Sequence, residues 1–317
     1  MHDLEVIFGG YMRVFITGGT GFIGHYVVKA LLQKGHEIVI ATRHPNKVPS
    51  LRAQSGVDFV ECSLTDFDKI AEGVKGCDAC VHIGIGWGET PTAMLMNDTR
   101  ATVNILEIAA KAGCSKFIYT SSTAAMGRMR PTMRETTSNL PLDLYGATKA
   151  AGEAYVLGFS RGYGTHFSEV KMKRNIIRPG YTFGNPAWPD GCSQPDRRFF
   201  DMARAVKEGR DINLIKNDGT QFIHASQQAE LYTQLLESDK NEEIFLGLGN
   251  VWIGWKEIAE MMISLRPETK TKIVETDMGW GDTPMLFDVQ KIKDQFGLVF
   301  DAHDYMMEHV KWTFDQV

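Results

Sequence analysis

A tyrosine and a lysine stand four residues apart in the segment LYGATKAAGEAYV, as Tyr145 and Lys149. The segment has helical character, and side chains at this spacing project from the same face of a helix. A free phenol has a pKa of about 10, and a nearby ammonium group stabilises the phenolate and lowers that pKa. We therefore expect Tyr145 to exchange a proton with the hydroxyl or carbonyl oxygen of a small molecule.

A third group should hold the reacting oxygen, and hydroxyl side chains are available upstream of this helix. The strand pattern KFIYT is followed by Ser121, Ser122 and Thr123. Ligands of parallel α/β proteins bind at the carboxyl edge of the sheet, where such a strand ends. The tyrosine–lysine spacing alone occurs by chance in many proteins. Its position after a glycine-rich turn and a serine-rich strand end makes it specific.

The glycine-rich turn TGGTGFIG spans residues 17–24 and joins a predicted strand to a predicted helix. Gly18 and Gly19 allow a tight turn. Gly21 lets backbone N–H groups approach a pyrophosphate, and Gly24 lets the helix pack closely on the strand. Because the N-terminus of a helix attracts anions, this context predicts a bound dinucleotide rather than an unoccupied turn.

The end of the second predicted strand decides which dinucleotide we expect. An acidic residue at this place would bind the 2'-hydroxyl of the adenosine ribose. The sequence instead reads Ala41, Thr42 and Arg43. Arg43 could pair with a 2'-phosphate through charge-assisted hydrogen bonds, so the sequence favours NADP over NAD. The alternative is that Arg43 is a solvated cation that stacks on adenine, and that NAD binds.

The ends of the third and fourth predicted strands could also line the cofactor crevice. Leu64 lies at the first of these ends, and Gly84, Ile85 and Gly86 lie at the second. Asp66 could line the crevice too, or it could be a charge at the N-terminus of the next helix.

The elements that position these residues alternate between apolar strand patterns and amphipathic helix patterns. This alternation predicts β-α-β units, six or seven parallel strands and long helices over about 97–112 and 144–161. The fold class is therefore α/β, a Rossmann-type doubly wound parallel sheet with a smaller, discontinuous C-terminal substrate lobe. We expect a leader or extension at 1–11, a dinucleotide-binding domain at 12–180 to which 222–249 returns, and a substrate lobe formed by 181–221 and 250–317.

Composition excludes several classes of function. The chain has 317 residues, a formal net charge of -5 and a pI near 6.0, so it has no basic excess for nucleic acid. No apolar run approaches the roughly 20 residues that cross a bilayer. The five cysteines are scattered, which predicts reduced thiols and a cytoplasmic protein; a redox role for Cys77 and Cys80 is disfavoured. No ligand spacing suggests a metal.

Together, TGGTGFIG, YTSS, YGATK and IIRPGYTFGNP resemble the extended short-chain dehydrogenase/reductase family, which includes the NAD-dependent epimerases and dehydratases. The resemblance implies that Tyr145 is the acid/base and that Lys149 tunes it and binds the nicotinamide ribose. Ser122 would orient the carbonyl, with Thr123 as its substitute. It also implies a homodimer that pairs through the two long helices. The cofactor-binding residues would be Gly18, Gly19, Thr20, Gly21, Phe22, Ile23, Gly24, Arg43, Leu64, Gly84, Ile85, Lys149 and Pro179.

Departures from the family pattern bear on the substrate. Nucleotide-sugar members have a basic residue where this chain has Gln221, and an aspartate near Gln227 or Gln228. We therefore favour an NADPH-dependent carbonyl reductase or dehydrogenase that acts on a small or non-nucleotide substrate. The alternatives are an NAD-dependent nucleotide-sugar epimerase or dehydratase, and a non-catalytic dinucleotide-binding sensor. His82 and His224 lie in apolar runs and are expected to be packing residues.

Overall fold

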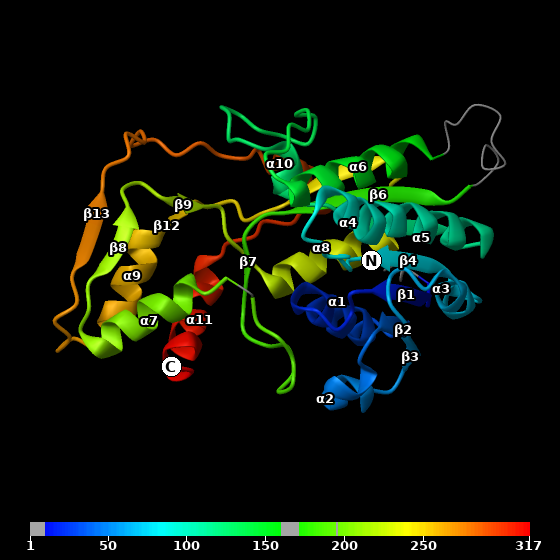
Figure 1. Ribbon diagram of the computed structural model, residues 1–317, viewed down its shortest axis with the longest axis horizontal. Helices are drawn as coiled ribbons and strands as arrows, with labels where there is room; N and C mark the ends of the chain where they lie inside the picture. The colour runs from blue at the N-terminus through cyan, green and yellow to red at the C-terminus, as the bar shows by residue number, and fades with distance from the viewer. Residues whose placement is uncertain (1–9, 160–170, 195) are drawn as a thin grey trace, which may run out of the picture.

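The computed structural model describes residues 10–159, 171–194 and 196–317. Most of the predicted leader 1–11 and the last residues of the predicted helix 144–161 lie outside the described residues. Figure 1 shows two parts, a sheet flanked by helices and a smaller lobe beside it.

The larger part is built on a seven-stranded sheet in which every neighbouring pair of strands is parallel. Its spatial order is β11-β6-β5-β4-β1-β2-β3. The strand order reverses between β1 and β4, which is the topological switch point of a doubly wound sheet. The strands are β1 (Arg13–Thr17), β2 (Glu37–Thr42), β3 (Val57–Glu61), β4 (Ala79–His82), β5 (Lys116–Thr120), β6 (Lys173–Pro179) and β11 (Glu243–Gly247). The predicted fold class is confirmed.

Helices cover both faces of this sheet. Alternate residues of a strand point to opposite faces, so Val14 and Ile16 pack on one side and Phe15 on the other. The first face is covered by α1 (Phe22–Gln33) and α8 (Ala225–Glu237). The second face is covered by α3 (Phe67–Val74), α5 (Arg100–Lys111) and α6 (Leu144–Gly158).

Short elements connect these layers and shape the carboxyl edge of the sheet. After β2 the chain forms η1 (Pro45–Lys47) and α2 (Pro49–Arg52). The helix predicted from about residue 97 begins earlier, as α4 (Pro91–Met94) and the π-helical turn η2 (Leu95–Thr99), which continue into α5. After β5 the chain forms the short 3-10 helix η3 (Thr123–Met126).

The smaller lobe has its own core, in which Phe199, Phe222 and Trp255 pack edge to face. Two strand pairs link it together, β8 with β13 in parallel and β9 with β12 antiparallel. Its elements are α7 (Arg198–Glu208), β8 (Ile212–Ile215), β9 (Gly219–Thr220), β12 (Ile253–Gly254), α9 (Trp255–Ser264), β13 (Ile273–Thr276) and α11 (His303–Asp315).

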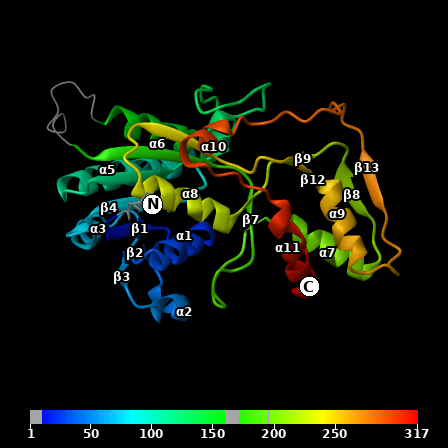
Figure 2. The same cartoon turned by 180° about the vertical axis from the view of Figure 1, so that it is seen from behind.

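The chain passes between sheet and lobe more than once, as Figure 2 shows from behind. The parallel pair β7 (Thr182–Phe183) and β10 (Ile223–His224) joins the outgoing and returning segments. Between β13 and α11, helix α10 (Gln290–Phe296) packs back on β11, where Phe296 contacts Phe245. The sequence-based domain boundaries stay a prediction. Within the described part of the chain, no helix combines the length and apolarity needed to cross a membrane.

Candidate active site

The glycine-rich turn lies at the switch point, between the carboxyl ends of β1 and β4. Gly18 has a φ of +72°, and a Cβ there would lie 2.5 Å from the backbone nitrogen of Gly84. The two turns therefore touch, and only glycine permits that contact together with the left-handed backbone. This close approach leaves the backbone of the first turn open to a ligand.

Helix α1 begins directly after this turn with unsatisfied backbone donors. Its N-cap is Gly21, which supplies no side-chain hydrogen bond, and its first turn contains no acidic residue. The free N–H groups and the helix dipole together favour an anion at this end. The turn therefore fits the pyrophosphate of a dinucleotide.

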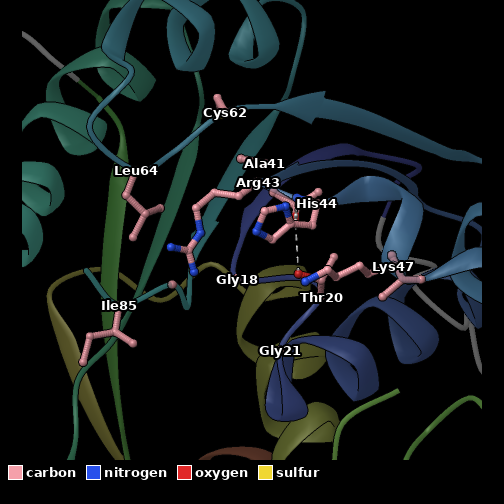
Figure 3. A pocket seen from close by; sticks show the side chains of 13 residues that line it. Gly18, Thr20, Gly21, Ala41, Arg43, His44, Lys47, Cys62, Leu64 and Ile85 are labelled. Atoms are coloured by element: carbon pink, nitrogen blue, oxygen red, sulfur yellow. Dashed lines mark hydrogen bonds between the residues drawn. The ribbon is translucent and has the colours of Figure 1, made fainter. Parts of the chain in front are cut away.

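A pocket of about 320 Å³ opens beside the turn (Figure 3). Seven of the predicted cofactor residues line it: Gly18, Thr20, Gly21, Arg43, Leu64, Gly84 and Ile85. The other predicted residues, Gly19, Phe22, Ile23, Gly24, Lys149 and Pro179, are not in its wall. Six lining residues were not predicted as cofactor ligands: Ala41, Thr42, His44, Lys47, Val48 and Cys62. His44, Lys47 and Val48 closely follow Arg43, so their position in the loop after β2 could have predicted them.

The pocket wall carries positive but no negative side chains. Arg43, His44 and Lys47 are all exposed, and none of the thirteen lining residues is Asp or Glu. Figure 3 shows the Arg43 side chain extending from the end of β2 over the pocket. Asp66 lies outside the wall, and its carboxylate accepts a hydrogen bond from Lys69 N at the start of α3. Asp66 was predicted either to line the crevice or to be a charge at the start of the next helix; the structure shows that it caps α3.

Tyr145 and Lys149 lie side by side in the first turns of α6, which Asp143 caps by accepting a 2.7 Å hydrogen bond from Gly146 N. The Nζ atom of Lys149 is 5.9 Å from the centre of the Tyr145 ring and 5.4 Å from that of Tyr119. Lys149 is only 2% exposed. The predicted pair is therefore brought together, with its ammonium group inside the protein.

The structure separates the hydroxyl groups at the end of β5. Ser121 is buried and donates a 2.5 Å hydrogen bond to Glu153, which Arg178 also contacts. Ser122 is partly exposed; its Oγ atom accepts a 3.1 Å hydrogen bond from Ala124 N, and its hydroxyl lies close enough to Tyr145 to lower the pKa of the phenol. Thr123 begins η3 and is also partly exposed. Of the three hydroxyl residues that follow β5, Ser122 is therefore the one that interacts with Tyr145.

The expected direction of the Tyr145 pKa shift was wrong. Burial raises the pKa of Tyr145 above its ordinary value, and the hydrogen bond from Ser122 opposes this only in part. Burial also lowers the pKa of Lys149, while the nearby Asp98 carboxylate raises it. The spacing of the two residues indicated their contact, but the burial that controls their ionisation depends on the packing of distant segments.

Asp98 is a member of this site that the sequence analysis missed. It is 1% exposed, and its Oδ2 atom lies 3.9 Å from Lys149 Nζ. Residues 98 and 149 lie far apart in the sequence and on different helical elements, so no local spacing could have indicated the pair.

Comparisons with known proteins agree with this arrangement. The model of the NAD dependent epimerase/dehydratase family matches residues 14–247, which is most of the chain. The chain belongs to this family. A 3-beta-hydroxysteroid dehydrogenase of Mycolicibacterium neoaurum is 32% identical over 229 residues, covering 67% of this chain and 58% of that relative.

Two solved structures share the fold. UDP-glucuronic acid 4-epimerase from Bacillus cereus, in complex with NAD, has a TM-score of 0.77 and 19% identity, covering 96% of this chain and 98% of its own. The dTDP-glucose 4,6-dehydratase DesIV from Streptomyces venezuelae, with NAD and TYD bound, has a TM-score of 0.76 and 18% identity, covering 96% and 97%. By its family match the protein is an enzyme of the extended short-chain dehydrogenase/reductase family, and the two solved structures show the shared fold.

Within this family member, the two histidines near the site are packing residues. His82 is fully buried, with hydrogen bonds of 2.6 Å to Thr17 and 2.9 Å to Thr102. His224 caps α8 and stacks on Tyr305, and burial lowers its pKa to about 4. Neither is free to act as a base.

Burial also raises the pKa of both Cys77 and Cys80, which disfavours their thiolates.

Gln221, which stands where nucleotide-sugar members of the family have a basic residue, is used inside the protein. Its amide donates to the carbonyl oxygens of Gly249 and Phe287, and its oxygen accepts a 2.7 Å hydrogen bond from Phe287 N. The side chain is 3% exposed and fully bonded, so it offers no group to a ligand. Among the described residues, no cluster of His, Cys, Asp or Glu could hold a metal ion.

Proposed function

We propose that this enzyme is an NADPH-dependent carbonyl reductase or dehydrogenase that acts on a small, non-nucleotide substrate. The observation that carries the proposal is the meeting of Ser122, Tyr145 and Lys149 at the carboxyl edge of the sheet that also holds the glycine-rich turn. A hydroxyl, a phenol and an ammonium group in contact provide an orienting donor, a proton donor and a fixed positive charge.

Each of these side chains has a defined task in the proposed reaction. A bound reduced nicotinamide would supply a hydride to the carbonyl carbon. Ser122 holds the carbonyl oxygen in place, and Thr123 is its substitute. Tyr145 donates a proton to that oxygen, and because burial raises its pKa, the proton is present at neutral pH. Lys149 supplies positive charge beside the developing negative charge and binds the nicotinamide ribose.

The preference for NADP over NAD rests on the adenosine pocket. Arg43 and Lys47 are exposed cations around the place where the adenosine 2'-position would lie, His44 is exposed beside them, and none of the described residues that line the pocket is a carboxylate that could bind a 2'-hydroxyl. A phosphate carries two negative charges or nearly so, and a planar guanidinium group binds it bidentately. The solved relatives named above hold NAD, which makes NAD the second choice.

An exposed aromatic ring lies beside Tyr145, and apolar side chains are exposed next to Phe287, the hydrogen-bond partner of Gln221. The Trp87 ring lies 6.5 Å from the Tyr145 ring and is 65% exposed. Met285 and Leu286 are exposed next to Phe287, which bridges to Met133 in the loop between η3 and α6. These side chains, together with the internally bonded Gln221, support a substrate with an apolar ring or chain. The name of the steroid dehydrogenase relative agrees with such a substrate.

The second candidate is a nucleotide-sugar epimerase or dehydratase that recycles its cofactor. It is favoured by the solved structures that match nearly the whole chain and are named for such activities. The two candidates differ in net redox change, because a reductase consumes one NADPH for each carbonyl reduced. A non-catalytic sensor would have no need of the Ser122, Tyr145 and Lys149 set.

The homodimer and the cytoplasmic location also stay proposals. The outer face of α6 carries Tyr155, which is 55% exposed, and the neighbouring turn carries Leu95 and Met96, which are 53% and 41% exposed. These apolar groups support pairing of α5 and α6 across a two-fold axis. The cysteines are free thiols, as in proteins of reducing compartments.

The test is NADPH oxidation on a panel of aromatic, alicyclic and aliphatic carbonyl compounds. We expect turnover on at least one of them, and we expect Tyr145→Phe to lower kcat by about 10²- to 10⁴-fold because it removes the proton donor. Tyr155→Phe is the matched control: it removes only the hydroxyl of an exposed tyrosine on the same helix and keeps the ring for the proposed dimer contact, so it should turn over like the parent. Turnover of Tyr145→Phe within a few-fold of the parent, or consumption of no NADPH on any carbonyl, would contradict the proposal.

A further inference from the structure

Asp98 is a buried carboxylate placed against the ammonium group of Lys149. It lies in the π-helical turn η2, which packs against α6. Its Oδ1 atom accepts a 3.0 Å hydrogen bond from Gly86 N, in the turn after β4. Its Oδ2 atom is buried, has no hydrogen-bond partner among the residues that the structure describes, and lies 3.9 Å from Lys149 Nζ. Single π-helical turns inside helices occur frequently at functional sites.

The Asp98–Lys149 pair offsets the free-energy cost of burying the Lys149 ammonium group. The Lys149 side chain is 3% exposed, and a buried ammonium ion loses several kcal/mol of hydration unless an opposite charge faces it. Asp98 supplies that charge and fixes the Nζ atom between the Tyr119 and Tyr145 rings. Because Lys149 Nζ lies 3.9 Å from Asp98 Oδ2 and 5.9 Å from the centre of the Tyr145 ring, the carboxylate is also near Tyr145, where its negative charge disfavours a phenolate. Asp98 and Lys149 therefore act on Tyr145 in opposite directions.

We propose that Asp98 is a positioning residue that keeps Lys149 as an ammonium ion and Tyr145 as a phenol, the form that can donate a proton to a carbonyl oxygen. This inference rests on the proposed function. In the reduction, a bound reduced nicotinamide would supply the hydride that adds to the carbonyl carbon, and the π electrons of the C=O bond would move to oxygen. The Tyr145 O–H bond breaks and its proton goes to that oxygen. The phenolate then regains a proton from solvent.

The other titratable groups around Tyr145 do not replace Asp98. Asp143, at the start of α6, also disfavours the phenolate, but its carboxylate is engaged in capping Gly146 N. His82 on β4 is buried between two threonine hydroxyls, and burial keeps it neutral by lowering its pKa. Tyr119 on β5 and Tyr232 on α8 are held as phenols, since burial raises the pKa of each. Glu153 is paired with Arg178.

The test is a pH titration of the Tyr145 phenolate by ultraviolet absorbance, taken as the difference between each protein and the same protein carrying Tyr145→Phe. Asp98→Asn keeps the shape of the side chain and the acceptor for Gly86 N but removes the charge. We expect its titration midpoint to fall by about one pH unit or more. Alcohol oxidation at neutral pH should rise in the same variant, which loss of a merely structural contact would not produce.

Glu107→Gln is the matched control, because it makes the same change of charge on α5 at a partly exposed position. Its midpoint should equal that of the parent. An unchanged or higher midpoint in folded Asp98→Asn would overturn the proposal. If circular dichroism shows that Asp98→Asn does not fold, Asp98→Ser is titrated in its place against the same criterion. The titration needs no substrate, so a shifted midpoint with no carbonyl reduced would refute the proposed function and leave the Asp98 coupling in place.

Discussion

In the pocket beside the glycine-rich turn the charged side chains are exposed, whereas around Tyr145 they are almost wholly buried. Arg43, His44 and Lys47 stand in solvent around the pocket. Lys149 and Asp98 are 2% and 1% exposed and face each other. Exposed charges are screened by water and salt, so each contributes a modest and adjustable share of binding. Buried charges are hardly screened, so the loss of one partner changes both folding and chemistry.

The largest effect should come from removing the buried cation. Lys149→Met leaves Asp98 uncompensated, so we expect a loss of about 3–5 kcal/mol in the free energy of unfolding. We also expect kcat to fall by about 10²- to 10⁴-fold, because the charge beside Tyr145 is gone. Urea denaturation and steady-state kinetics measure the two effects.

A double substitution separates these two losses. Lys149→Met with Asp98→Asn removes both charges and should recover much of the stability but none of the turnover. Lys111→Met, at an exposed end of α5, is the control and should change the free energy of unfolding by less than about 0.5 kcal/mol. A Lys149→Met protein as stable as the parent would show that the buried pair is not as we describe it.

A smaller effect, on cofactor binding, is expected from substitution of the exposed Arg43 in the pocket beside the glycine-rich turn. Arg43→Ala removes a charge-assisted contact of about 1.5–3 kcal/mol, which corresponds to an NADPH dissociation constant weaker by about 10- to 100-fold. The dissociation constant for NADH should hardly change, since NADH has no 2'-phosphate. Calorimetric titration of both dinucleotides measures this difference, with Arg204→Ala on α7 as the control. Equal losses for the two dinucleotides would mean that Arg43 only stacks on adenine.

The smallest effect should come from Lys47, which adds charge to the same pocket on a more flexible side chain. Lys47→Ala should weaken NADPH binding by about 2- to 5-fold, as is usual for an exposed ion pair. Raising the ionic strength should reduce the difference between this variant and the parent, because salt screens exposed charges. A difference that does not depend on salt would place Lys47 in a direct, desolvated contact.

The pocket beside the glycine-rich turn and the buried pair also differ in how well a single sequence predicts them. The glycine-rich turn, Arg43 and the pairing of Tyr145 with Lys149 are encoded within short segments, since each depends on backbone freedom or helical spacing. The alternation of apolar runs predicts six or seven parallel strands, and the structure has a sheet of seven. His44 and Lys47 could have been predicted in the same way, because they follow Arg43 in the loop after β2.

Other features depend on contacts between distant segments, which a single sequence does not show. Asp98 meets Lys149 only because η2 packs on α6, and the Tyr145 pKa rises because of burial that the sequence does not reveal. In the lobe, β8 and β13 pair across about 60 residues, and β9 and β12 are two-residue strands without a periodic pattern. For this reason the sequence predicts the bounds of the lobe but not its strand pairs.

The central claim is that Tyr145 protonates a carbonyl oxygen while a hydride is transferred from NADPH with net reduction. The most direct measurement supplies NADPH deuterated at C4 with an accepted carbonyl compound and follows the product by mass spectrometry. The account predicts one deuterium in each alcohol formed from the labelled position, one NADP released per alcohol, and almost no product from Tyr145→Phe. Product formed without deuterium and without net NADPH consumption would contradict it, because the enzyme would then be recycling its cofactor.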